Sequence, residues 1–254
     1  MKIATWNINS VRARIDRLVG WLKSAQPDVL FLQELKCTDA EFPREAVEAA
    51  GYRAETFGQK TYNGVAIISR HPVADVVRGM NDGVDDDHAR VIWCTVGGVR
   101  MCGLYAPNGQ AVGSPAYAYK LEWYARLTKL LVKQQHAELL LCGDFNVAPE
   151  ELDVWDPRYF ADKTLFTPPE RAAFKTLRDS LGLVDAYRKH HSEGGKFSWW
   201  DYRLLAFPKN TGLRIDHFLL SRGVADRCTA ADIDREARKG KLPSDHAPVW
   251  VQLA

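Results

Sequence analysis

The sequence predicts an α/β fold with mixed β-sheets, and three observations carry this prediction. Short segments rich in Val, Ile, Leu and aromatic residues recur along the chain, often bounded by Gly or Pro, as in buried strands. Longer segments between them carry apolar residues at helical spacing. Gly97-Gly98 separates two of the strand-like segments, which indicates a hairpin. Hairpins combined with helical crossovers give sheets that contain both antiparallel and parallel pairs.

The elements follow in order from these patterns. The segments 11–25 and 117–135 each place apolar residues on one helical stripe. A third helix, 169–181, begins after a Thr cap followed by prolines in the sequence TPPE and ends before Gly182. The predicted strands are 2–8, 28–33, 64–69, 90–96, 99–105, 138–143, 214–221 and 247–253.

Length and composition describe an ordinary globular chain. With 254 residues, no internal repeat and no linker-like segment, residues 1–254 are predicted to form a single domain. The formal net charge of +2 is too small to indicate a nucleic-acid partner, so any attraction to phosphate has to come from local patches. No stretch is long enough to span a membrane, and the N-terminus lacks the apolar core of a signal peptide.

The five cysteines argue against a disulfide framework. Their number is odd and no CxxC pair occurs, so neither paired disulfides nor a zinc knuckle is indicated. Cys94, Cys102 and Cys142 lie inside apolar runs, where a free thiol behaves as a small hydrophobic side chain. A reducing, cytoplasmic compartment is therefore expected.

Several predicted strands carry or run into polar side chains that packing does not explain. These residues are Asn7, Glu34, Asp144, Asn146, Asp216, Asp245 and His246. Each has an ordinary alternative: an acid can open a turn, an amide can bond to backbone, and a lone histidine can be a satisfied core residue. Together they are harder to dismiss, because burying unpaired charge is costly. A bound cation or substrate is the expected partner.

Magnesium suits the oxygen-rich part of this set. It binds one or two carboxylates together with water and substrate phosphate, and Glu34, Asp144 and Asp245 offer the carboxylates. Asp216 and His246 suit a second task, in which a carboxylate orients an imidazole for proton or phosphate chemistry. Zinc fits less well, because the set has one histidine among oxygen donors.

With these residues in hand, the sequence resembles the exonuclease III family of abasic-site endonucleases. The similarity runs along the whole chain. Its motifs are KIATWNINSVRAR (2–14), LFLQELK (30–36), NGVAIISR (63–70), YAPNG (105–109), CGDFNVAP (142–149), FSWWDYR (197–203), GLRIDHFLLS (212–221) and SDHAPV (244–249). The fold that this resemblance implies is a four-layer α/β sandwich, with two packed mixed β-sheets flanked by helices and the active site at one edge.

The resemblance also implies roles for the residues of the metal site and the reaction. Glu34 looks like the principal metal ligand with Asp245 close by, and Asn7 and Asn146 would orient phosphate or water. Asp144 would position or deprotonate the attacking water, and His246, aligned by Asp216, would bond to the scissile phosphate. Tyr105 would support the phosphate or the leaving oxygen. The implied ion is Mg²⁺, with Mn²⁺ as a substitute, and the resemblance leaves open whether one ion or two are bound. The implied ligand set is Asn7, Glu34, Asp144, Asn146, Asp245 and His246.

DNA contacts are implied for a further set. By resemblance these are Arg90, Trp199, Arg203, Leu213 and Ile215, with the three apolar residues around an extruded sugar. Three positions depart from the family pattern: Asn9 replaces an aspartate, Trp199 a phenylalanine, and Arg203 an apolar wedge. Basic residues also crowd the loops near the motifs, and a solvated surface is the alternative reading of them. They are Arg12, Arg14, Lys36, Lys60, Arg203, Lys209, Arg214, Arg238, Lys239 and Lys241.

The function expected from the resemblance is Mg²⁺-dependent DNA repair. The protein would be a monomeric 3′-5′ exonuclease on double-stranded DNA that also cuts 5′ to abasic sites and removes 3′ blocking groups. One alternative keeps the chemistry but uses an inositol phosphate or a sphingolipid head group. Another is a DNA-binding module without catalysis, against which the intact set of polar residues argues.

Overall fold

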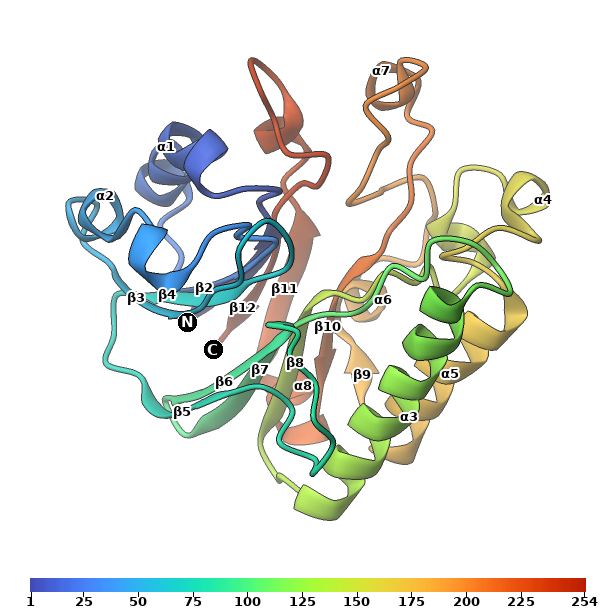
Figure 1. Cartoon of the computed structure of the whole chain (residues 1–254), viewed down its shortest axis with the longest axis horizontal. Coiled ribbons are helices and arrows are strands. Elements are labelled where there is room, and N and C mark those ends of the chain that lie inside the picture. Colours follow the sequence, from blue (N-terminus) through green and yellow to red (C-terminus); the bar gives the residue numbers. More distant parts are fainter.

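The computed structural model describes all 254 residues as two six-stranded sheets covered by helices (Figure 1). The first sheet has the order β11-β12-β1-β2-β4-β3 and the second the order β5-β6-β7-β8-β10-β9. The strands are β1 Lys2–Asn7, β2 Val29–Gln33, β3 Arg53–Phe57, β4 Val65–Ser69, β5 Ala74–Arg78, β6 Val91–Val96, β7 Val99–Tyr105, β8 Leu139–Asp144, β9 Val184–Asp185, β10 Asp216–Leu220, β11 Cys228–Ile233 and β12 Val249–Leu253. The helices are α1 Ile15–Ala25, α2 Arg44–Glu48, α3 Pro115–Gln134, α4 Pro157–Phe160, α5 Pro168–Ser180, α6 Ala186–His190, α7 Ala206–Lys209 and α8 Arg222–Arg227.

Alternation along the inner strands explains the four layers. In β2, Val29 and Phe31 enter the core between the sheets, whereas Leu30 and Leu32 enter the core under α1 and α2. Successive side chains of β8 likewise alternate between the central core and the core under α3 and α5. A strand that is buried on both faces needs an uninterrupted apolar run, because successive side chains point to opposite faces. The predicted α/β sandwich with two mixed sheets is confirmed.

The helices begin where the sequence supplies caps. Helix α3 starts with Pro115 after Ser114, whose side chain accepts a hydrogen bond from the backbone of Tyr117. Helix α5 starts with Pro168 after Thr167, which forms a capping box with Glu170. The predicted helix 11–25 is divided instead into a 3-10 turn at Arg12–Arg14 followed by α1, because Arg14 leaves helical geometry with φ −129° and ψ 22°.

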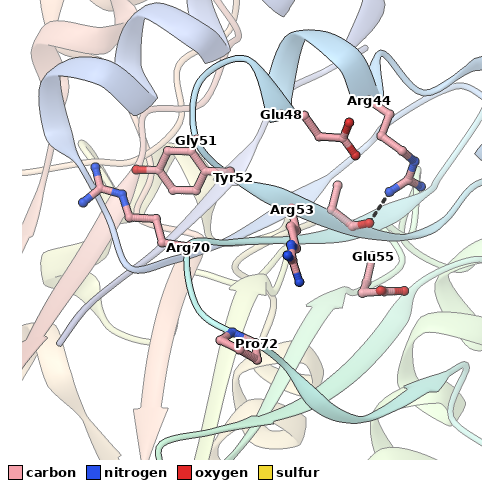
Figure 2. Close-up of a pocket in the computed structure, with 9 residues that line it drawn as sticks. Arg44, Glu48, Gly51, Tyr52, Arg53, Glu55, Arg70 and Pro72 are labelled. Carbon is pink, nitrogen blue, oxygen red and sulfur yellow. Dashed lines mark hydrogen bonds between the residues drawn. The ribbon is translucent and has the colours of Figure 1, made fainter.

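The four strands that the sequence did not predict are the four edge strands, β3, β5, β9 and β11. An edge strand needs no continuous apolar run, and β5 is almost entirely exposed. Side chains cap the outer carbonyls of the longer edges. In β3, Arg44 donates to Ala54 O, beside the hollow shown in Figure 2, and Arg78 Nε donates to Thr56 O at 2.7 Å.

The edge strand β11 is capped in the same way, since His191 Nε2 lies 2.7 Å from Ala231 O. These three capped carbonyls are therefore less available to a strand from another molecule. In β5 the edge is interrupted by a bulge between Ala74 and Val77 instead, where Arg100 of β7 donates to Asp75 O from within the sheet.

Both sheets have a parallel pair at their centre. Strands β1 and β2 are parallel, with α1 in the crossover, and β7 and β8 are parallel, with α3 in the crossover. The remaining pairs are antiparallel, including the predicted hairpin β6–β7. The carboxyl ends of the central strands thus lie at one end of the sandwich, and they deliver Asn7, Glu34, Tyr105 and Asp144 there.

Two further expectations concern the whole chain. No helix has the length and apolar character that a membrane span requires. All five cysteines are buried and free, and for Cys94, Cys102 and Cys142 this burial agrees with their positions in apolar runs.

Candidate active site

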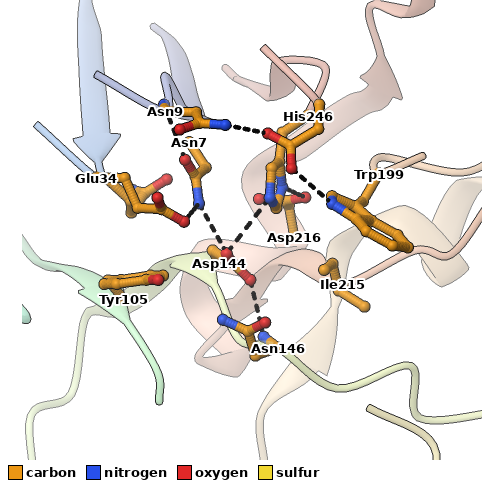
Figure 3. Close-up of polar contacts among 12 residues, drawn as sticks. Asn7, Asn9, Glu34, Tyr105, Asp144, Asn146, Trp199, Ile215, Asp216 and His246 are labelled. Carbon is orange, nitrogen blue, oxygen red and sulfur yellow. Dashed lines mark hydrogen bonds and ion pairs between the residues drawn. The ribbon is translucent and has the colours of Figure 1, made fainter. Parts of the chain in front are cut away.

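Asn7 lies at the centre of the polar cluster (Figure 3). Its side chain is fully buried at the end of β1, and its amide nitrogen donates to Glu34 Oε1 and to Asp144 Oδ2, both at 2.9 Å. Its amide oxygen accepts a hydrogen bond from the backbone of Asn9 at 3.1 Å. One amide therefore holds two carboxylates from different sheets at a fixed separation.

Glu34 follows β2 in a left-handed backbone conformation with φ +54°. This conformation is uncommon for a non-glycine residue and is typical of functional sites. Its second carboxylate oxygen lies 2.8 Å from Lys36 Nζ, which also donates to Asn9 Oδ1 at 2.6 Å. Glu34 is thus paired with a lysine on one side and with the Asn7 amide on the other.

Asp144 and Asn146 are held by the end of β8. The strand can lie against β7 because residue 143 is glycine: a Cβ there would lie 1.9 Å from Leu104 O. Asp144 Oδ1 accepts from the backbone of Asn146 at 2.9 Å, and the Asn146 amide bonds to Ala106 O at 3.0 Å. Both side chains are buried, so their orientation is fixed before any substrate binds.

His246 and Asp216 form the predicted acid–histidine pair. His246 Nδ1 lies 2.9 Å from Asp216 Oδ2, and Nε2 lies 3.6 Å from Asp144 Oδ2. Ser198 Oγ accepts from the backbone of Asp216 at 3.1 Å and holds this strand end. The second Asp216 oxygen, Oδ1, is buried without a hydrogen-bond partner. Such an orphaned oxygen is rare in folded proteins and marks a site built to receive another group.

Asp245 lies on the other side of His246 and is held by two donors. Trp199 Nε1 donates to one carboxylate oxygen and Asn9 Nδ2 to the other, each at 3.0 Å. Asn9 therefore links Asp245 to Lys36, which in turn pairs with Glu34.

Burial and neighbouring charges shift the pKa values of this cluster in opposite directions. Burial raises the pKa of Asp144 above its ordinary value, and the Asp216 carboxylate adds to the shift although His246 opposes it. Burial alone would lower the pKa of His246, but the carboxylates of Asp216 and Asp144 outweigh it and raise this pKa. His246 is thus suited to stay protonated and donate, and Asp144 to accept a proton.

Tyr105 ends β7 opposite Asp144. Burial, together with the carboxylates of Glu34 and Asp144, raises the pKa of Tyr105 well above its ordinary value, so its hydroxyl remains a donor. Arg90 stacks over the Tyr105 ring at 4.9 Å and donates to its backbone oxygen at 3.2 Å. The predicted DNA-binding residue Arg90 therefore also supports Tyr105.

The donor set fits a hard divalent cation. Carboxylate and amide oxygens predominate, and Glu34 and Asp144 converge on one amide. Asp144, Asp216 and His246 also place ligand atoms within 4.8 Å of one another. In Asp216 only Oδ2 is bonded to His246, and the buried Oδ1 has no partner within the protein.

The residues predicted around an extruded sugar are not equally accessible. Leu213 is 0% exposed and Ile215 is 1% exposed, and both pack with Phe166 and Leu165. Trp199 pairs with Leu213 through backbone hydrogen bonds and keeps part of its ring accessible. Trp199 can contact a nucleotide directly, whereas Leu213 and Ile215 form the packed base behind it.

The basic residues near the motifs separate into exposed and buried groups. Arg203 is on an exposed loop, paired with Asp201 at 2.8 Å. Two predicted surface cations are buried instead. Arg214 bonds to Asp153 and Asp185 inside the protein, and Arg238 stacks on Tyr202. Arg214 is therefore not free for phosphate, and the sequence could not show this because its partners lie far away along the chain.

Several residues of the site were not singled out in the sequence. Ser244 Oγ donates to Asn7 O at 2.6 Å and accepts from the backbone of His246, and Ser198 holds Asp216. A serine within a motif has no feature in the sequence that distinguishes it as a site residue. Lys120 could have been found from the sequence, because it lies on the same helical stripe as Tyr117, Tyr124 and Leu127, where a lysine is unexpected.

Comparison with known proteins agrees with this geometry. The model of the endonuclease/exonuclease/phosphatase family matches residues 4–246. The chain is 36% identical over 267 aligned positions to exodeoxyribonuclease III of Haemophilus influenzae, with complete coverage of both chains. It is 42% identical to the 3′ phosphatase NExo of Neisseria bound to a product DNA hairpin, with a TM-score of 0.97, covering 100% of this chain and 99% of that one. It is 35% identical to an AP endonuclease of Archaeoglobus fulgidus, with a TM-score of 0.96 and the same coverage.

These similarities span the chain and include every strand end that forms the polar cluster. The resemblance to exonuclease III-like nucleases is confirmed, and with it the assignment as a phosphodiester hydrolase. The chain therefore belongs to the endonuclease/exonuclease/phosphatase family.

Proposed function

We propose that this protein is a Mg²⁺-dependent DNA repair nuclease that hydrolyses phosphodiesters and phosphomonoesters at the 3′ ends of double-stranded DNA. The observation that carries the proposal is the single amide of Asn7, which holds Glu34 and Asp144 together beside the His246–Asp216 pair. That arrangement provides a cation site, a proton acceptor and an oriented cationic donor within one buried cluster.

Mg²⁺ would be held by Glu34, with Asp245 near it and with Asn7, Asp144, Asn146 and His246 as the remaining members of the predicted set. The bound ion supplies charge neutralisation at the phosphate and polarises its oxygen. Mn²⁺ offers similar oxygen chemistry and is expected to substitute for it.

The site residues are suited to different tasks in the reaction because their charges differ. Asp144 accepts the proton of the attacking water, because burial keeps its pKa high enough for proton transfer near neutral pH. His246, oriented by Asp216, donates a hydrogen bond to a phosphate oxygen. The Asn146 amide orients the phosphate, and the Tyr105 hydroxyl supports the phosphate or the leaving oxygen.

A second candidate activity is incision on the 5′ side of an abasic site in duplex DNA. Trp199 favours it, because its ring is partly accessible directly beside Asp245. Leu213 and Ile215 are packed in the core, so neither side chain borders open space for an extruded sugar. This favours hydrolysis at 3′ ends over abasic-site incision as the main activity.

Matched duplexes test these activities. We expect cleavage of a duplex with a recessed 3′ end and of one with a 3′-phosphate, dependent on Mg²⁺, abolished by EDTA and restored by Mn²⁺. A duplex with an internal tetrahydrofuran abasic analogue measures the second activity against an intact duplex. A ratio near one for this last pair would exclude abasic incision, and inactivity on every duplex would exclude the proposal. Cleavage of an inositol phosphate or sphingolipid head group under the same conditions would favour the alternative substrate.

The proposal includes a monomer that acts alone on DNA in the cytoplasm. Capped carbonyls on the edge strands β3 and β11 support the monomer, because each removes an acceptor that an added strand would use. Exposed Arg203 beside Trp199 supports DNA as the partner, since phosphate contacts position a duplex without reading its sequence.

A further inference from the structure

Lys120 carries a fully buried ammonium group beside the candidate active site, although it lies in the second turn of the amphipathic helix α3. Its side chain and that of Glu170 are both 0% exposed, and the two form an ion pair between α3 and α5. A buried ion pair is costly to desolvate and often contributes little net stability. Packing alone therefore does not account for a lysine on this face of the helix.

The other hydrogen bonds of the ammonium group connect it to the site. Nζ donates to the backbone oxygen of Asn146 at 2.6 Å and to that of Asn108 at 3.1 Å. With Glu170 as the third acceptor, all three N–H donors of Lys120 are used. The two asparagines in turn bond to each other, from Asn108 Nδ2 to Asn146 Oδ1 at 3.1 Å. One buried cation thus fixes the backbone under two adjacent amides.

Asn146 depends on such support because its backbone is left-handed, with φ +50°. Its side chain can face the reacting centre only while the backbone keeps this uncommon conformation. Glu170 serves a different segment: its carboxylate accepts from the backbone of Leu165 and Thr167, both at 3.0 Å, ahead of α5. The two members of the ion pair therefore hold different loops: Lys120 bonds directly to Asn146, whereas the loop held by Glu170 meets the catalytic loop only through the bond from Ala148 N to Leu165 O.

We propose that Lys120 is a positioning residue of the nuclease, which orients Asn146 and Asn108 toward the scissile phosphate through their backbone carbonyls. This inference rests on the proposed function, because it assigns Lys120 a role through Asn146. It predicts that loss of the Lys120 donors lowers kcat and leaves the KM for DNA nearly unchanged.

Two variants break the same ion pair from opposite ends and serve as matched partners. Lys120→Met removes the charge and all three donors at similar volume. Glu170→Gln removes the opposite charge but leaves Lys120 able to donate to both carbonyls. The double variant Lys120→Met/Glu170→Gln removes the pair altogether, and so it avoids an uncompensated buried charge.

The expected result is a separation of activity from stability. A small displacement of positioned groups can cost about 100-fold in rate, so kcat should fall by about that factor in Lys120→Met and in the double variant. Glu170→Gln should keep kcat within about threefold of wild type at a temperature where it is folded. The double variant should regain the Tm lost in Lys120→Met but not the kcat.

Equal losses of kcat in Lys120→Met and Glu170→Gln would overturn the inference, as would recovery of kcat together with Tm in the double variant. Where Lys120→Met does not fold, the kcat of the double variant is compared with that of Glu170→Gln. Equal losses of kcat in these two variants would then overturn the inference. A second readout is independent of DNA cleavage: the side-chain amide NMR signals of Asn108 and Asn146 should move in Lys120→Met and stay in Glu170→Gln. Failure of the proposed function on duplexes leaves this readout intact, whereas unmoved amide signals refute the positioning role alone.

Discussion

Under the proposed function, Glu34 is the residue at which metal binding can be separated from folding. Glu34→Gln keeps an acceptor for the Asn7 amide but removes the negative charge, and the Glu34–Lys36 pair is partly exposed, so little stability is lost. We expect activity on a recessed 3′ end to fall by about 100-fold or more, because a bound cation contributes several kcal/mol to transition-state stabilisation. The measurement is the rate against Mg²⁺ concentration, with Tm as the folding check and Glu122→Gln as a surface control. A near-normal rate at low Mg²⁺ would remove Glu34 from the metal site.

In the proposed mechanism Asp216 acts through the ring of His246, so its replacement should change both rate and pH dependence. In Asp216→Asn the carboxylate that raises the pKa of His246 is gone. His246 then loses its proton at lower pH, and the alkaline limit of the rate profile should move downward. We expect a rate loss of about tenfold to 1,000-fold, the usual range for acid–base groups. An unchanged rate with an unchanged profile would show that Asp216 is only structural.

At the scale of elements, β10 joins the site to a buried charge network. Arg214 leads into this strand and bonds to Asp153 and Asp185, while His217 lies 3.0 Å from Arg214 and 2.8 Å from Val147 O. Burial and the Arg214 charge lower the pKa of His217 from 6.5 to about 4. Between these values the unfolded chain binds the proton and the folded protein does not. Stability from this group is therefore complete above pH 6.5 and falls as the pH drops toward 4.

The size of this effect follows from the shift. Between pH 7 and pH 4.5, His217 should account for about 2 kcal/mol of lost unfolding free energy, since one pKa unit corresponds to about 1.4 kcal/mol. Urea unfolding of wild type and His217→Gln at the two pH values measures it. We expect the difference between the two pH values to be smaller in the variant. Equal pH dependence in both proteins would mean that His217 does not titrate in this range.

The sequence predicted strands well where both faces of the strand are buried, and poorly at the sheet edges, where they are not. All eight predicted strands exist, because inner strands such as β2 and β8 require continuous apolar runs. Edge strands such as β3 and β11 alternate or mix polar residues, so they lack this pattern. In the site, acids and amides at strand ends were visible in the sequence. The hydroxyls of Ser198 and Ser244 and the burial of Arg214 were not, since long-range contacts alone define them.

At the scale of the whole molecule, the edge caps should keep the protein monomeric. Arg44 and Arg78 together occupy two outward carbonyls of β3, and an added strand would need those acceptors. We expect the variant Arg44→Ala/Arg78→Ala to self-associate at concentrations where wild type sediments as a monomer. Arg53→Ala, on the same strand, is the matched control because the Arg53 side chain caps no carbonyl. Monomeric sedimentation of the double variant would show that the caps are dispensable.

Strand β12 lies between β1 and β11, so the first sheet closes only with a segment made late in synthesis. The contact between Trp6 and His246 spans 240 residues, and that between Asn7 and Asp144 spans 137. Asn7 and Glu34 are synthesised early, but the candidate active site is complete only after Asp245 and His246 have also been synthesised. Contacts of such long range also form slowly. If Asp245 and His246 act as proposed, a nascent chain is expected to stay inactive until its last strand has been made, so hydrolytic activity would appear only in the finished fold.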